Sequence, residues 1–142
     1  MRKILFRAKR KDTGGWIEGF YACESNHTCI YAELKYRHYI YKDVCLDFGL
    51  GGLVDFEVIP ETVGQYTELT DKNGVKIFEG DIVSISKEDE RGVVRWEDGD
   101  AAYVIGCDDN VYLLSFLVTL WERDIEVIGN IHDNPELMEV VK

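Results

Sequence analysis

The chain reads Gly80-Asp81-Ile82-Val83-Ser84-Ile85-Ser86 and, shortly afterwards, Gly92-Val93-Val94-Arg95-Trp96-Glu97. Apolar and polar side chains alternate at nearly every position in both segments, as they do in a β-strand with one face in the core and one in water. The two segments therefore predict neighbouring strands of a mainly β domain. Because Val94 and Trp96 fall on the same face, the alternation also predicts a core position for Trp96.

A hairpin is predicted just before these strands. Asp71-Lys72-Asn73-Gly74 lies between the strand-like segments Tyr66–Leu69 and Val75–Phe78. Asn-Gly is the commonest two-residue hairpin signal, because both residues adopt positive φ at low cost. Asp98-Gly99 gives a second, weaker turn signal.

Short segments rich in Val, Ile, Tyr, Phe and Trp continue in both directions along the chain. Further strands are predicted at Ile4–Ala8, Trp16–Cys23, Thr28–Leu34, His38–Leu46, Phe56–Ile59, Ala102–Ile105, Val111–Leu114 and Ile125–Ile131. Helical signals are limited to Leu117–Arg123 and to Asn134–Met138, where Asn134 is the expected cap. Gly49-Leu50-Gly51-Gly52 is expected to be a turn. We expect a mainly β fold with an irregular N-terminal β region (1–64), an SH3-like small barrel (65–142) and few short helices.

The charge of the chain is acidic but uneven. The 142 residues include 16 Lys and Arg against 27 Asp and Glu, a net charge of −11. The first eleven residues nevertheless hold six basic residues and no acidic one: Arg2, Lys3, Arg7, Lys9, Arg10 and Lys11. The favoured interpretation is an edge strand whose cations discourage edge pairing or meet acidic neighbours. The alternative is a basic arm that grips phosphate.

Nothing in the sequence assigns a catalytic, cofactor-binding or metal-binding residue, and no cofactor is expected. Cys23, His27, Cys29 and His38 could form a metal site by residue type, but their spacing is not that of a zinc knuckle. The cysteines are therefore expected to be reduced. The apolar runs are too short for a signal peptide or a membrane span, so we expect a cytoplasmic protein without membrane association.

Carboxylates and aromatic rings offer two further hypotheses. Asp98, Asp100, Asp108 and Asp109 could form an acid–base or cation site, although solvated loops are favoured. Tyrosines 31, 36, 39 and 41 and the rings of Trp96, Tyr103, Tyr112 and Trp121 could bind a peptide or nucleotide. The alternative is that these rings fill two small cores.

Three segments of the chain resemble the YopX protein family of phages and prophages. The central one runs from Val58 to Val83 and includes Pro60-Glu61-Thr62-Val63-Gly64-Gln65-Tyr66-Thr67 and Asp71-Lys72-Asn73-Gly74. The others are Phe6–Arg10 with Gly15–Gly19 at the start and Val127–Leu137 at the end. Glu68 departs from the pattern, since a small residue, usually Gly, is expected there. The resemblance implies a mainly β fold with an SH3-like barrel and brings no catalytic residue with it.

We expect a phage- or prophage-encoded protein that acts as a non-catalytic protein-binding or assembly module, with a phage or host protein as its partner. A homo-oligomer is a second form of this hypothesis, because uncovered strands and aromatic faces need burying. The alternatives are nucleic-acid association through the basic N-terminal arm, or an acidic DNA mimic acting on a host DNA-binding protein.

Overall fold

A computed structural model describes residues 4–25, 35–45, 51–85, 90–120 and 125–139. The predicted strand Thr28–Leu34 lies outside the described residues. The chain divides into two compact units, one covering residues 3–65 and the other residues 66–142. The boundary lies within strand β5, whose first residues pair in one unit and whose last residues pair in the other.

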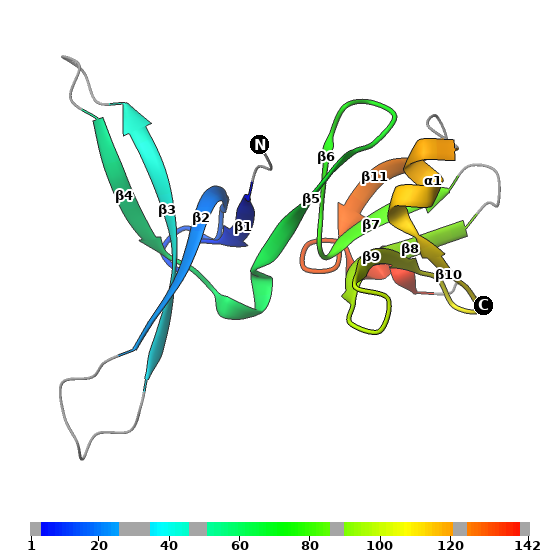
Figure 1. Ribbon diagram of the computed structural model, residues 1–142. Coiled ribbons are helices and arrows are strands. Elements are labelled where there is room, and N and C mark those ends of the chain that lie inside the picture. The colour runs from blue at the N-terminus through cyan, green and yellow to red at the C-terminus, as the bar shows by residue number, and fades with distance from the viewer. Residues whose placement is uncertain (1–3, 26–34, 46–50, 86–89, 121–124, 140–142) are drawn as a thin grey trace. The chain divides into compact units, whose positions relative to one another are not determined.

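The first unit is an antiparallel sheet in the order β4-β3-β2-β1, to which the start of β5 is added beside β1 (Figure 1). Its strands are β1 (Phe6–Lys9), β2 (Trp16–Ser25), β3 (Tyr36–Cys45), β4 (Gly51–Glu57) and β5 (Gly64–Thr70), with a 3₁₀ turn at Pro60–Thr62. The core consists of the buried residues Ala8, Ile17, Ile40 and Val58, packed with Phe6, Tyr21, Phe56 and Val63.

Two expectations for this unit were wrong. The first strand is not an edge, because β1 pairs with β2 on one side and with Gly64 and Gln65 of β5 on the other. The second error lies within the turn expected at Gly49–Gly52, since Gly51 and Gly52 begin strand β4 and pair with Cys45 and Val44. Gly49 and Leu50 lie outside the described residues. Glycine suggested a turn, but cross-strand pairing decided the conformation.

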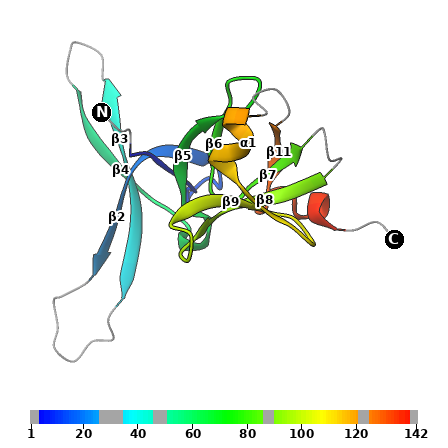
Figure 2. The same cartoon turned by 45° about the vertical axis from the view of Figure 1, so that its right-hand side comes forward.

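The second unit contains a five-stranded antiparallel sheet in the order β10-β9-β8-β7-β11, with α1 following β10 (Figures 1 and 2). Its elements are β6 (Lys76–Phe78), β7 (Asp81–Ile85), β8 (Glu90–Glu97), β9 (Ala102–Gly106), β10 (Val111–Leu113), α1 (Leu114–Leu120) and β11 (Ile125–Asn130), with a 3₁₀ turn at Pro135–Met138. A core of eight buried residues joins them: Ile77, Val83, Ile85, Val94, Ile105, Leu114, Leu117 and Ile125.

The prediction of a mainly β fold with few helices is confirmed, but the small barrel is not closed. No pairing between β10 and β11 occurs among the described residues, so the five-stranded sheet remains open. The predicted C-terminal helix is a single 3₁₀ turn, and the Asn134 side chain does not cap it. Its Oδ1 instead accepts a hydrogen bond from Asn130 N at 3.4 Å.

The predicted hairpin at Asn73-Gly74 forms, but with a wider turn than the two-residue type. Only Gly74 has positive φ (77°), and its N–H donates to Asp71 O at 3.0 Å. The buried Asp71 carboxylate accepts hydrogen bonds from Asn73 N and Val75 N through Oδ1, at 2.8 and 2.9 Å. Its Oδ2 accepts one from Val127 N of β11 at 3.0 Å. Asp71 therefore ties this turn to the five-stranded sheet.

Candidate functional site

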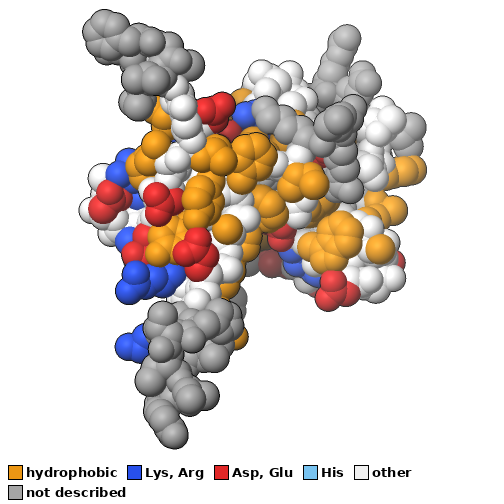
Figure 3. Space-filling view, turned by 60° about the vertical axis from the view of Figure 1, so that its left-hand side comes forward, with side chains coloured by type: hydrophobic (Ala, Val, Ile, Leu, Met, Phe, Trp, Pro, Cys, Tyr) orange, Lys and Arg blue, Asp and Glu red, His pale blue; other side chains and the backbone are white. Residues whose placement is uncertain are grey.

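One face of the β2–β3–β4 sheet presents apolar side chains to solvent. Register and strand alternation place Phe20, Ala22, Tyr39, Tyr41 and Leu53 together on this face, which we call the aromatic face. Phe20 is 59% exposed and Leu53 62% exposed, while Tyr39 and Tyr41 are half-buried. Figure 3 shows hydrophobic side chains gathered over the first unit, between its two grey segments. Large apolar side chains gathered in this way indicate a binding surface.

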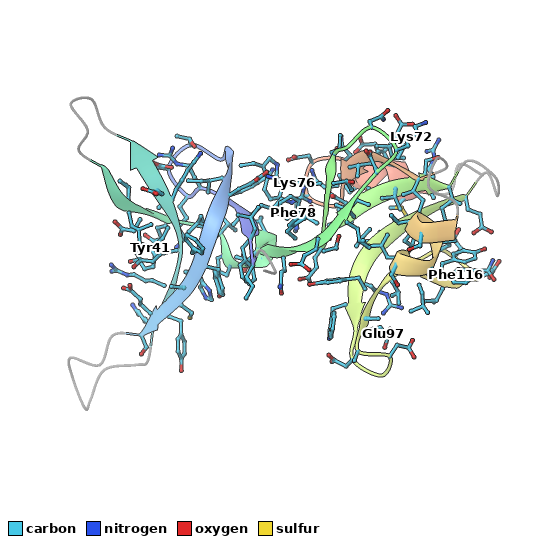
Figure 4. The ribbon with its side chains drawn as sticks, turned by 45° about the horizontal axis from the view of Figure 1, so that its top comes forward. Tyr41, Lys72, Lys76, Phe78, Glu97 and Phe116 are labelled. Atoms are coloured by element: carbon cyan, nitrogen blue, oxygen red, sulfur yellow. The ribbon has the colours of Figure 1, made fainter. Side chains whose placement is uncertain are left out.

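Carboxylates lie beside Tyr41 on the aromatic face. Tyr41, seen projecting from β3 in Figure 4, donates a hydrogen bond from its hydroxyl to Glu24 Oε1 at 2.6 Å. This hydrogen bond, with desolvation and the charge of Asp55, raises the pKa of Tyr41 to about 12. The Tyr39 and Tyr41 rings lie 6.3 Å apart in a tilted arrangement. The Tyr41 hydroxyl is thus fixed beside acidic groups, whereas the Tyr39 hydroxyl interacts with Arg37. The carboxylates beside Tyr41 favour a partner with apolar and basic residues.

The described basic residues of the N-terminal segment are engaged within the first unit, while Arg2 and Lys3 lie outside the described residues. The Arg7 guanidinium lies 4.7 Å from the centre of the Trp16 ring, and the Lys9 ammonium lies 5.6 Å from it. Arg10 pairs with Asp12 at 2.5 Å, and Lys11 pairs with Glu57 at 3.0 Å. The prediction that these cations meet acidic neighbours is therefore confirmed for Arg10 and Lys11.

The opposite face of the same sheet contains two members of the hypothetical metal site. Cys23 and His38 are cross-strand partners, but His38 Nδ1 is 2.6 Å from the Tyr21 hydroxyl and the rings of Tyr21 and His38 stack. His27 and Cys29 lie outside the described residues. Among the residues that are described, no group of three or more His, Cys, Asp or Glu side chains is arranged to hold a metal ion.

The four carboxylates proposed as an acid–base site are not brought together. Asp98 and Asp100 lie in the β8–β9 turn, whereas Asp108 and Asp109 follow the other end of β9. Asp108 and Asp109 instead line a polar hollow of about 430 Å³ with Glu90, Cys107 and Glu139, among other residues. Burial, and then the neighbouring Glu90, raises the pKa of the Cys107 thiol to about 11. A thiol held in its protonated form is a poor nucleophile, so this hollow does not contain an activated cysteine.

Trp96 is not in the core, contrary to the prediction from alternation. Its side chain is 44% exposed, its Nε1 donates to Asp98 Oδ1 at 2.9 Å, and its ring packs edge-on against Tyr103 at 5.0 Å. Val94 shares its face but is buried, because Trp96 lies two cross-strand pairs further toward the hairpin end. Tyr31 and Trp121, also considered as binding rings, lie outside the described residues.

The net negative charge belongs to the second unit. Residues 1–65 contain nine basic and nine acidic residues, whereas residues 66–142 contain seven basic and 18 acidic residues. The whole net charge of −11 therefore falls on residues 66–142. The aromatic face lies in the part of the chain that carries no net charge.

Sequence reasoning missed Phe20 and Leu53 as members of the candidate surface, although it selected Tyr39 and Tyr41. Phe20 was read as one strand residue among many, and Leu53 was assigned to no element. The available signal was strand alternation through Trp16–Ser25, in which Ile17 is buried while Phe20 lies on the opposite face.

The fold and this surface define a two-unit, mainly β protein with an exposed aromatic sheet face. The chain belongs to the YopX protein family, whose model matches residues 5–139. Among solved structures it is similar to the crystal structure of protein EF1440 from Enterococcus faecalis, with 24% identity and a TM-score of 0.58. That match covers 96% of this chain and 99% of EF1440, so the likeness extends through both units. A search of the curated proteins gives no match.

None of the helices in the described part of the chain is long and apolar enough to cross a bilayer.

Proposed function

We propose that this protein is a phage- or prophage-encoded, non-catalytic protein-binding module that acts in the cytoplasm of the bacterial host. The observation that supports the proposal is the aromatic face, where Phe20 and Leu53 are more than half exposed beside Tyr39 and Tyr41. Aromatic rings provide large contact areas with few rotatable bonds, which makes them frequent anchors of protein interfaces.

The partner is a protein segment with an apolar centre and basic flanks. Phe20 and Tyr41 supply the apolar contact, while Glu24, Asp43 and Asp55 lie on the same face around them. Acidic groups at the rim of an interface accelerate association with a basic partner and disfavour acidic ones. The interaction should therefore weaken as salt concentration rises, without being abolished.

The test begins with affinity capture from bacteria that carry the phage or prophage, followed by titration of the purified recovered protein. Phe20→Ser should weaken binding by about tenfold or more, because it removes an exposed ring at the centre of the face. Phe116→Ser is the matched control, since Phe116 of α1 is 54% exposed and lies in the second unit (Figure 4). Equal binding by both variants and the unmodified chain would refute the proposal, as would a reproducible failure to recover any partner.

A second function is supported by the charge distribution. The concentration of 18 acidic residues within residues 66–142 favours an acidic surface that mimics DNA and occupies a host DNA-binding protein. In that case competitor DNA should displace the captured partner, while Phe20→Ser should leave its affinity unchanged.

A gel-shift experiment at low salt tests the opposite alternative, in which the chain itself binds nucleic acid through its basic segment.

A further inference from the structure

Within the described part of the chain, strand β4 has one edge without a partner strand. Its seven residues pair with β3 in an unbroken register from Tyr39↔Glu57 to Cys45↔Gly51, and β4 ends the strand order of its sheet (Figure 1). At Glu57 the outer edge is occupied, because Lys11 N donates to Glu57 O at 3.0 Å. From Gly51 to Asp55, no strand of the described residues pairs with the outer edge.

This edge lacks the features with which proteins protect the ends of their sheets. The other terminal strands are short, like the three-residue β6 and β10, or are interrupted, like β11 with its register shift between Val127 and Gly129. β4 contains no proline, lysine, arginine or bulge, and its residues from Gly51 to Asp55 are all exposed. A long, regular and exposed edge of this kind is a template for pairing with another strand.

The direction of the backbone groups along this edge follows from one hydrogen bond. Val58 N donates to His38 O at 2.9 Å, so these two residues form a hydrogen-bonded pair in the β3–β4 register. Hydrogen-bonded and non-hydrogen-bonded pairs alternate along an antiparallel ladder. The N–H and C=O groups of Gly51, Leu53 and Asp55 therefore point away from β3, toward the open edge.

We propose that β4 pairs antiparallel with β4 of a second copy of this chain, about a two-fold axis at Leu53. In this register Leu53 lies opposite Leu53 of the second copy, and Gly51 lies opposite Asp55. The outward groups of these residues then form about six backbone hydrogen bonds between the copies. The two sheets become one continuous sheet.

The side chains favour a second copy as the occupant and also select the register. Because Asp55 meets Gly51, no carboxylate lies directly opposite another. Shifting the axis to Asp55 would place Asp55 against itself, and like charges directly opposite are destabilising. On one face Leu53 packs against its copy, and on the other Val54 lies opposite Gly52, so both exposed apolar side chains are covered.

This pairing does not rest on the proposed partner-binding function, although Leu53 is also a member of the aromatic face. Five residues per strand bury less than the roughly 1,200 Å² of the smaller stable interfaces. We therefore expect a dissociation constant of about 10–100 µM. The pairing is a concentration-dependent dimer rather than an obligate one.

Sedimentation equilibrium between about 5 and 500 µM brackets that affinity range. The average mass should rise from the 16.3 kDa of one chain toward twice that value. Leu53→Lys places two cations opposite each other, so this variant should remain a monomer at all these concentrations. Leu53→Thr keeps a residue that favours the β-strand conformation, so this variant should still dimerise. A constant mass of 16.3 kDa for the unmodified chain, or a dimer that Leu53→Lys leaves intact, would overturn the proposal.

Cross-linking tests the register and does not depend on the equilibrium mass. In a chain whose four native cysteines are replaced by serine, Leu53→Cys should give a covalent dimer on mild oxidation, since opposed Cα atoms lie about 5.5 Å apart. Val75→Cys is the control, because Val75 is 48% exposed in the second unit. Equal cross-linking at both positions would contradict the register.

Phe20→Ser separates this proposal from the proposed function. It should reduce partner binding and leave the dimer intact, because Phe20 lies on β2, away from the open edge. If the unmodified chain forms the dimer but captures no partner, the binding proposal alone is refuted.

Discussion

The two units bury their strands in different ways. The first packs four fully or nearly fully buried residues on one face of its sheet and leaves Phe20 and Leu53 exposed on the other. The second gathers eight buried residues from strands and helix into a single core and carries the whole net charge. The larger core and charged surface of the second unit are typical of a unit that is stable by itself. The half-covered sheet of the first unit is typical of a unit that binds a partner.

The largest expected effect comes from the carboxylate that holds the second unit together. Asp71→Ala removes the acceptor of three backbone N–H groups, from Asn73, Val75 and Val127. Leaving buried donors without partners should reduce the free energy of unfolding by about 3 kcal/mol. Amide hydrogen exchange in β7 and β11 measures this unit separately from the first.

Asp109→Ala is the control for this substitution, because Asp109 is exposed and a surface substitution should change stability by less than about 0.5 kcal/mol. If Asp71→Ala were as mild as Asp109→Ala, the second unit would not depend on this polar link. The contrast with the first unit would then rest on core size alone.

The next effect concerns how tightly the first unit packs on its covered face. A Cβ at Gly19 would lie 2.3 Å from Tyr41 O and 2.9 Å from Ile40 Cγ2, so Gly19→Ala should cost about 2 kcal/mol of stability. Gly52→Ala provides a control in the same sheet, since a Cβ there meets no atom within 4 Å. Urea unfolding of the two variants should differ clearly in midpoint. Equal midpoints would mean that β2 and β3 separate easily.

Cysteine labelling compares a side chain from each unit. In a chain carrying Cys29→Ser and Cys45→Ser, the exposed Cys23 should be alkylated at least about tenfold faster than Cys107 near pH 8, because alkylation requires the thiolate. The pKa of Cys107 is raised from 9.0 to about 11. The protonated thiol therefore contributes to the stability of the folded chain below pH 9, and this contribution is lost as the pH rises through 11. Its labelling rate should accordingly rise with pH up to about 11. Comparable rates near pH 8 would place Cys107 in open solvent.

Much of the strand layout follows from the sequence, because alternation and turn chemistry are local signals. The segments around Ile82, Val94 and Tyr112 were assigned correctly for this reason. β4 was placed too late in the chain because its glycines suggested a turn, and only the partner strand β3 makes them extended. Barrel closure depends on long-range pairing between strands, for which the sequence contains no local signal.

The candidate surface was only half predictable. Tyr39 and Tyr41 were recognised on one face, but the sequence could not show which face the core would cover. Packing of Ile40 against Ala8 and Val58 settles this, since Ile40 points to the opposite side from its neighbours Tyr39 and Tyr41. Exposure of Phe20 and Leu53 follows from the same packing.

The smallest expected effect concerns Glu68, the one residue of the central motif where a small residue, usually Gly, was expected. Glu68 has φ 69°, a left-handed conformation that disfavours side chains with a Cβ, and it lies where the β5–β6 register shifts between Tyr66 and Thr70. Glu68→Gly should therefore stabilise the second unit by about 1 kcal/mol, seen as a higher midpoint in urea unfolding.

The control for this last substitution is a glycine at a position that does not need one. Thr70→Gly in the same strand should lower stability by a few tenths to about 1 kcal/mol, since glycine is unfavourable in an extended strand. Opposite signs for the two substitutions would show that the backbone conformation at residue 68 is the source of the effect. If Glu68→Gly instead destabilised the unit, contacts of the Glu68 side chain would outweigh the left-handed backbone. This position would then hold the second unit together through its side chain, as Asp71 does.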